Sequence, residues 1–260
     1  MSRSIIKSAI EESDPVLAQD ALREIDVLLS SSSGNNKGYL LFSKASCYGI
    51  LGDFEEARRT LDIALRENPG IDSQLTFDFM QGLLFQQEGK YKEAFESLST
   101  RMALHSEQFK KPEARSFYED IQQRRAFLLV TLKDFKEAIP VLTEIPSFDI
   151  EESLKSDAFA SLGLCYLELQ EYRLAKDYLL RAFAIGLTKR WKGHAHLYLG
   201  IAYFYCDILQ QAKVEFQRCE ELVGEYPLPI LDVYAWLSSI SKRLGEISES
   251  KRYSALSERN

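Results

Sequence analysis

An alanine set in a regular pattern of apolar and polar positions recurs five times along this chain. A large side chain, aromatic in four of the five copies, stands three residues before it, and a leucine or phenylalanine stands four residues after it. Positions three and four residues apart share one face of an α-helix, so each copy predicts an amphipathic helix with the alanine on its buried face. The repeated alanines are Ala57, Ala94, Ala138, Ala175 and Ala212.

A second pattern precedes each repeated alanine. A small residue stands twelve positions before it, and a large residue, aromatic in four copies, stands nine positions before it. The small residue lets a neighbouring helix approach closely, and the large one fills the same face one turn later. Short turns separate the two patterns, so each unit is predicted to be a pair of antiparallel helices. The small residues are Ala45, Gly82, Ala126, Gly163 and Gly200, and the turns fall at Gly52-Asp53, Gly89-Lys90, Lys133-Asp134, Gln170-Glu171 and Cys206-Asp207.

The spacing of the repeated alanines is 37, 44, 37 and 37 residues. A fixed period in this range indicates helix pairs that stack side by side into a solenoid. The longer interval places about seven extra residues in the stretch Ala103–Arg115, where Pro112 interrupts any continuous helix. We expect a surface loop or a helix extension there.

The first clear unit carries a family resemblance. It reads Ala45, Tyr48, Gly52, Phe54, Ala57, Ala64 and Pro69, and the fourth unit, LGLCYLELQEYRLAKDYLLRAF, follows nearly the same pattern. This order of small residue, aromatic, turn, aromatic and alanine resembles the tetratricopeptide repeat over residues 38–225, although the usual period of that family is shorter and only Pro69 supplies its closing proline. The resemblance implies an all-α fold, a right-handed α-solenoid of about 12–14 helices in antiparallel pairs.

Both ends of the chain repeat the pattern more weakly. Residues 1–36 hold a degenerate pair, aligned by Ala21, which lies 36 residues before Ala57. Residues 230–260 hold a degenerate repeat with a turn at Gly245 and a final helix over Ile247–Ser257, whose polar outer face suits the cap of a solenoid. We therefore expect one solenoid domain over 1–260.

Composition and charge narrow the function. Of the 260 residues 45% are hydrophobic and 27% charged, as in ordinary globular proteins, and the net charge of −7 disfavours nucleic-acid binding. The basic stretch 189–192 contains Trp191, which we expect to pack at a helix start. The longest apolar run, Leu197–Cys206, is half of the ~20 residues that a membrane helix needs. With no signal-peptide pattern at the N-terminus, a cytoplasmic location without membrane insertion is expected.

No pattern of catalytic or ligand residues emerges from the sequence. The four cysteines form no C-x-x-C pair and are expected to be buried free thiols. The three histidines lack metal-ligand spacing, and neither a nucleophile elbow nor a phosphate-binding loop is present. We therefore predict no enzyme activity, no metal and no cofactor.

The resemblance implies that the first helix of each pair lines a concave face where partners bind. We assign to this face the positions 15, 11 and 8 residues before each repeated alanine, most of which are apolar and none charged. The predicted groove residues are Phe42, Phe79, Leu83, Gln86, Phe127, Leu164, Leu167, Leu197, Ile201 and Phe204, flanked by Tyr205. The Lys, Asn and Arg clamp of co-chaperone members is absent, because Ser46 and Leu83 stand at the Asn positions and Arg124 is the only cation nearby. Binding of Hsp70 or Hsp90 C-terminal tails is therefore not expected.

Three interpretations of the apolar row stay open: a groove for a partner peptide or helix, burial against neighbouring repeats, and self-association. The leading functional hypothesis is an adaptor or scaffold that binds a protein partner. A regulatory peptide sensor is one alternative, although some 37 residues before the first clear unit are too few for the effector domain of such receptors. A self-associating structural subunit of a larger complex is another.

Overall fold

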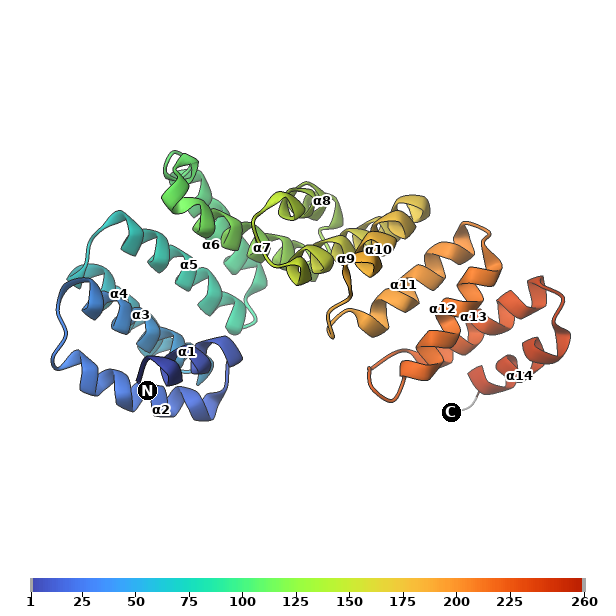
Figure 1. Ribbon diagram of the computed structural model, residues 1–260, viewed down its shortest axis with the longest axis horizontal. Helices are drawn as coiled ribbons and strands as arrows, with labels where there is room; N and C mark the ends of the chain where they lie inside the picture. The colour runs from blue at the N-terminus through green and yellow to red at the C-terminus, as the bar shows by residue number, and fades with distance from the viewer. Residues whose placement is uncertain (1, 259–260) are drawn as a thin grey trace. The chain divides into compact units, whose positions relative to one another are not determined.

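A computed structural model describes residues 2–258, and within this range the chain forms fourteen α-helices and no strand (Figure 1). This confirms the all-α solenoid of helix pairs. The helices are α1 (Ser2–Glu12), α2 (Pro15–Leu29), α3 (Gly34–Ile50), α4 (Phe54–Glu67), α5 (Ile71–Gln87), α6 (Tyr91–Leu104), α7 (Arg115–Thr131), α8 (Phe135–Glu144), α9 (Glu152–Glu168), α10 (Tyr172–Ile185), α11 (Lys192–Tyr205), α12 (Leu209–Leu222), α13 (Ile230–Arg243) and α14 (Ile247–Ser257).

The chain packs into two compact units, Met1–Leu132 and Lys133–Asn260, here called the N-terminal and C-terminal units. The boundary falls in the turn of the third clear repeat. In the N-terminal unit the first helices of successive pairs, α1, α3 and α5, lie side by side (Figure 1). We call them inner helices and their partners outer helices.

Each predicted turn is closed by one residue in the left-handed backbone region, five positions before the repeated alanine. The φ angle there is 79° at Gly52, 75° at Gly89, 63° at Lys133 and Gln170, and 62° at Asp207. At four of the five turns, those at Gly52, Gly89, Gln170 and Asp207, the following amide donates back across the turn, as Asp53 N–H does to the carbonyl of Tyr48 at 2.9 Å. This is the bonding of a Schellman cap, which satisfies carbonyls at the helix end.

The small residue twelve positions before each alanine makes the close approach predicted for it. A Cβ on Gly82 would lie 2.5 Å from the Cδ2 of Leu98, and one on Gly163 would lie 2.5 Å from the Cγ of Leu179. All five repeated alanines are fully buried. The helix–helix contact within each unit is therefore set by the small residue on one helix and the leucine or phenylalanine on the other.

The terminal pairs obey the same geometry, with one correction to the predicted register. Ser13 has a φ of 51° and occupies the turn position, and the Asp14 carboxylate caps α2 by accepting from Val16 N–H at 2.7 Å. The position of the repeated alanine is therefore held by Ala18 and not by Ala21, because the turn, not the spacing to the next unit, sets the register. Gly245, with a φ of 80°, closes the last pair as predicted.

The insertion in the stretch Ala103–Arg115 forms a loop that is held by hydrogen bonds to α5. It contains two short 3-10 turns, Gln108–Lys110 and Pro112–Ala114. At its start, His105 Nε2 lies 2.9 Å from an oxygen of Asp78, a carboxylate that is only 2% exposed. Gln74 donates to the same carboxylate at 3.0 Å, so α5 holds the first residue of the loop in place.

The structure also places Trp191 and the cysteines. Trp191 is buried at the start of α11, against Ala160 and Ala182. All four cysteines are free, three of them buried and Cys206 half-buried. Among residues 2–258, no helix is long and apolar enough to cross a membrane, and no cluster of three potential metal ligands occurs.

Candidate functional site

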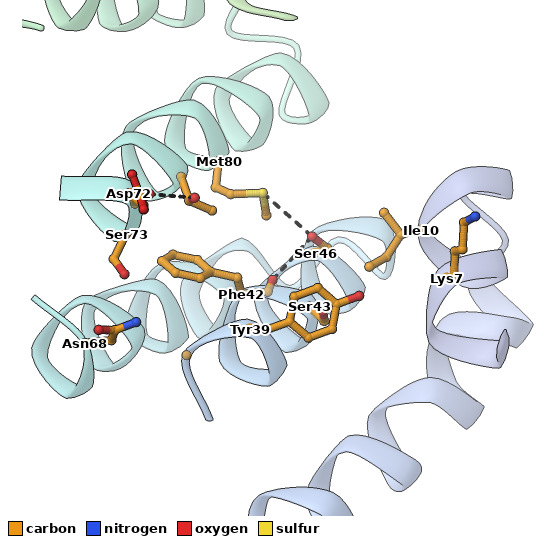
Figure 2. Close-up of a pocket in the computed structure, with 12 residues that line it drawn as sticks. Lys7, Ile10, Tyr39, Phe42, Ser43, Ser46, Asn68, Asp72, Ser73 and Met80 are labelled. Atoms are coloured by element: carbon orange, nitrogen blue, oxygen red, sulfur yellow. Dashed lines mark hydrogen bonds between the residues drawn. The ribbon is translucent and has the colours of Figure 1, made fainter. Parts of the chain in front are cut away.

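Two adjoining cavities open on the inner helices of the N-terminal unit. The first, here called the Asp72 cavity, has a volume of about 450 Å³ and is lined by Lys7, Ile10, Gly38, Tyr39, Phe42, Ser43, Ser46, Asn68, Asp72, Ser73, Thr76 and Met80 (Figure 2). The second, the Arg124 cavity, has a volume of about 280 Å³ and is lined by Ile10, Ser13, Ser46, Ile50, Met80, Leu83, Leu84, Gln86, Gln87 and Arg124. Ile10, Ser46 and Met80 line both, so the cavities form one continuous surface, here called the inner groove.

The groove runs along the helix axes because its walls are helical stripes. On α3 the lining residues follow each other at intervals of three and four, from Tyr39 to Ile50, and on α5 they do so from Asp72 to Gln87. Fifteen residues of α-helix separate the two ends of the α5 stripe, which makes the groove roughly 22 Å long. Residues of α1 complete the wall on the far side of α3.

The Asp72 cavity combines an apolar floor with a polar rim. Figure 2 shows Phe42 and Met80 between α3 and α5, with the Ser46 hydroxyl between them. That hydroxyl donates to the Phe42 carbonyl at 3.3 Å and lies 3.8 Å from the Met80 sulfur. Asp72 is exposed at the start of α5, where its backbone carbonyl accepts from the Thr76 hydroxyl at 2.8 Å. The cavity can thus hold an apolar group next to hydrogen-bonding groups.

The Arg124 cavity has a mixed lining of apolar side chains, serine hydroxyls and glutamine amides. Ile50 and Leu83 are among its apolar residues, and Arg124, which is exposed to solvent, contributes its only cation among the described lining residues. Desolvation by the surrounding protein lowers the pKa of Arg124, against the opposing effect of Asp120 one helical turn away. Desolvation also raises the pKa of Asp120. Both residues are exposed, so water still screens the two charges.

The predicted groove residues divide into several groups. Phe42, Leu83 and Gln86 line the inner groove. Phe79 and Phe127 are half-buried and pack against the core cluster that contains Leu98 and Leu128.

In the C-terminal unit, two predicted groove residues belong to the core, which corrects the prediction. Leu167 is 8% exposed and packs with Ala175 and Ala202, and Leu197 is 7% exposed in the cluster that contains Val233. These two side chains pack between successive repeats. This agrees with the second interpretation of the apolar row, burial against neighbouring repeats. Leu164, Ile201 and Phe204 are half-buried against the core clusters of this unit.

Tyr205 differs from the rest of the predicted row, because it is 51% exposed. Its ring stacks on Tyr172 of α10, in the preceding repeat, with 4.2 Å between the ring centroids. It also meets the ring of Trp236 edge-on, at 6.0 Å.

The groove lining is broader than the predicted row and contains only part of it. Besides Phe42 and Gln86, which stand 15 and 8 residues before a repeated alanine as predicted, it includes the positions 18, 14, 11 and 7 residues before it. In α3 these positions are Tyr39, Ser43, Ser46 and Ile50, and in α5 they are Thr76, Met80, Leu83 and Gln87. The sequence reasoning therefore missed the Asp72 end, Met80 and the α1 wall.

This arrangement defines a class of protein, an α-solenoid of antiparallel helix pairs with a groove on its inner helices. Residues 156–185 match the sequence model of the tetratricopeptide repeat. Together with the helix pairs of the fold, this match supports the resemblance to tetratricopeptide repeat proteins.

Solved structures of similar fold come from several organisms. A signal transduction ATPase with numerous domains from Pyrococcus horikoshii, which has a tetratricopeptide repeat sensor, is 15% identical, with a TM-score of 0.74 over 98% of this chain and 42% of that one. The C-terminal part of a repeat-containing protein from Cytophaga hutchinsonii is 13% identical, with a TM-score of 0.66 over 97% of this chain and 92% of that one. BtubC from P. vanneervenii is 18% identical, with a TM-score of 0.63 over 85% and 95%. None of the curated proteins compared with the chain matches its sequence.

Proposed function

We propose that this chain is a non-catalytic adaptor or scaffold that binds a segment of a partner protein in the inner groove of its N-terminal unit. The observation that carries the proposal is the continuity of the Asp72 and Arg124 cavities through Ile10, Ser46 and Met80. A continuous surface with apolar walls and hydroxyl groups can take side chains and main-chain groups of one bound segment together.

The dimensions of the groove favour an extended segment. At about 3.3 Å per residue, a length of roughly 22 Å holds six or seven residues of extended chain. A whole helix is about 10 Å wide with its side chains, which is broad for a cavity of 450 Å³. An extended peptide instead inserts single side chains between Phe42 and Met80.

The test is a selection of peptides from a random display library on the full chain, followed by fluorescence anisotropy with the selected peptides. Thr76→Arg places a long side chain in the groove, and we expect it to abolish binding. Thr143→Arg is the matched control, because Thr143 is exposed on outer helix α8 and, like Thr76, donates its hydroxyl to the carbonyl four residues earlier. Circular dichroism establishes that both variants are folded.

Three results would contradict the proposal. One is that no peptide is selected. Another is that Thr76→Arg binds the selected peptides as well as the control does. A third is that light scattering shows a dimer which only Thr76→Arg dissociates, because the groove would then serve self-association.

A further inference from the structure

The Arg124 cavity has a single charged group among its described lining residues. Its other lining residues are five apolar side chains, two serines and two glutamines. The guanidinium of Arg124 donates no hydrogen bond to the part of the chain that the structure describes, and Asp120 acts on it only through the electrostatic field. The five N–H donors of this group are thus available at the edge of the cavity.

Gln86 lines the same cavity and has an unsatisfied group. Its Oε1 is buried and accepts no hydrogen bond within the described residues. A buried carbonyl oxygen without a donor is unfavourable, and a bound N–H group that reaches it would remove this cost. The cavity therefore offers a cationic donor and a neutral acceptor together.

We propose that the Arg124 cavity receives the carboxylate of an internal acidic side chain, Glu or Asp, of a bound extended peptide, and that Gln86 accepts a hydrogen bond from a main-chain amide of the same peptide. This proposal rests on the function proposed above. A carboxylate is the partner that a guanidinium binds with two parallel hydrogen bonds. The apolar side chains of the same cavity favour an apolar residue next to the acidic one in the peptide.

The experiment uses two pools of peptides, capped at both ends, in which a fixed Glu or a fixed Gln stands among randomised apolar residues. Binding to the full chain and to Arg124→Gln is measured by anisotropy, which completes a double-mutant cycle. We expect the Glu pool to bind the full chain about tenfold more tightly than the Gln pool, a difference that corresponds to ~1.4 kcal/mol. In Arg124→Gln the two pools should bind alike. Arg59→Gln on the exposed face of outer helix α4 is the control and should leave the preference intact.

The outcomes separate the two proposals. If the peptides bind and Thr76→Arg blocks them, but the Glu and Gln pools bind equally, the groove function stands and the carboxylate site is wrong. The same holds if the Glu preference persists in Arg124→Gln, or if only peptides with a free C-terminal carboxylate bind. If neither pool nor any library peptide binds, both proposals fall.

Discussion

Gly163 on inner helix α9 lies directly against Leu179 on outer helix α10, so that a Cβ on the glycine would stand 2.5 Å from the Cγ of the leucine and 3.3 Å from the Ala175 carbonyl oxygen. Both residues are buried. The contact therefore leaves no room for a side chain at position 163. The two helices can lie this close together because residue 163 has no side chain.

Gly163→Leu is accordingly expected to destabilise the C-terminal unit by about 1–3 kcal/mol or more, as overpacking of a core does. The measurement is the urea midpoint followed by circular dichroism. Gly224→Ala is the control, because a Cβ there meets no atom within 4 Å. Equal midpoints for Gly163→Leu and the original chain would show that the helices can move apart freely.

The left-handed turn residues predict that substitutions at equivalent positions change the stability in opposite directions. Gly89→Ala should destabilise by about 1 kcal/mol through backbone strain alone, because a Cβ at Gly89 meets no atom within 4 Å. Gln170→Gly should stabilise by up to ~1 kcal/mol, reduced by the greater freedom of glycine in the unfolded chain. Urea unfolding measures both, and a loss of stability in Gln170→Gly would contradict the common role of these positions.

The buried carboxylate of Asp78 predicts how the insertion is held. Asp78→Asn removes the charge that faces His105 and Arg101, so we expect a loss of about 1–3 kcal/mol and a loosened loop. Limited trypsin digestion should then cut after Lys110 faster than in the original chain. Glu93→Gln, at an exposed position of α6, should leave the cleavage rate nearly unchanged.

The buried thiols predict a pH dependence. Burial raises the pKa of Cys165 and of Cys219 to about 12 and that of Cys47 to about 11, from an ordinary value of 9.0. Above pH 9 the unfolded chain loses these protons while the folded chain keeps them, so this contribution to the free energy of unfolding declines as the pH rises from about 9 to 12. Urea midpoints at a series of alkaline pH values measure it.

Thiol modification gives a second readout of the same burial. Iodoacetamide at neutral pH should label the half-buried Cys206 first, with the three buried cysteines labelled only after unfolding. Mass spectrometry of the modified chain identifies the sites. Early labelling of Cys165 would contradict the packing of α9.

The helices and turns could be predicted from the sequence because each unit contains its own instructions. The small residue of one helix packs against the other helix of the same pair, and the turn lies between them, so one stretch of about 37 residues determines one helix pair. The turns at Lys133 and Gln170 could be placed only by alignment with the copies that have Gly52 and Gly89.

The groove could not be predicted to the same degree. Which stripe of an inner helix faces outward depends on the angle between successive pairs, and that angle comes from contacts between units, such as that of Leu197 with the core around Val233. The Arg124 cavity also needs Ile10, which is far away in sequence and comes from a pair with a degenerate pattern. Arg124 was recognised as a cation near the expected face, but its apolar surroundings come from three other helices.

The repeated turn has a consequence for the history of the chain. The same hydrogen bond across a left-handed turn residue closes most of the helix pairs. A genetic crossover between two copies of the repeat at equivalent turn residues would therefore remove or add one whole helix pair. The hydrogen bonding at the junction would stay the same. Exchange between the turns at Gln170 and Asp207 would change the chain length by 37 residues and leave residues 1–132, which carry the whole inner groove, untouched. The number of repeats can therefore change during evolution without any change in the residues of the inner groove.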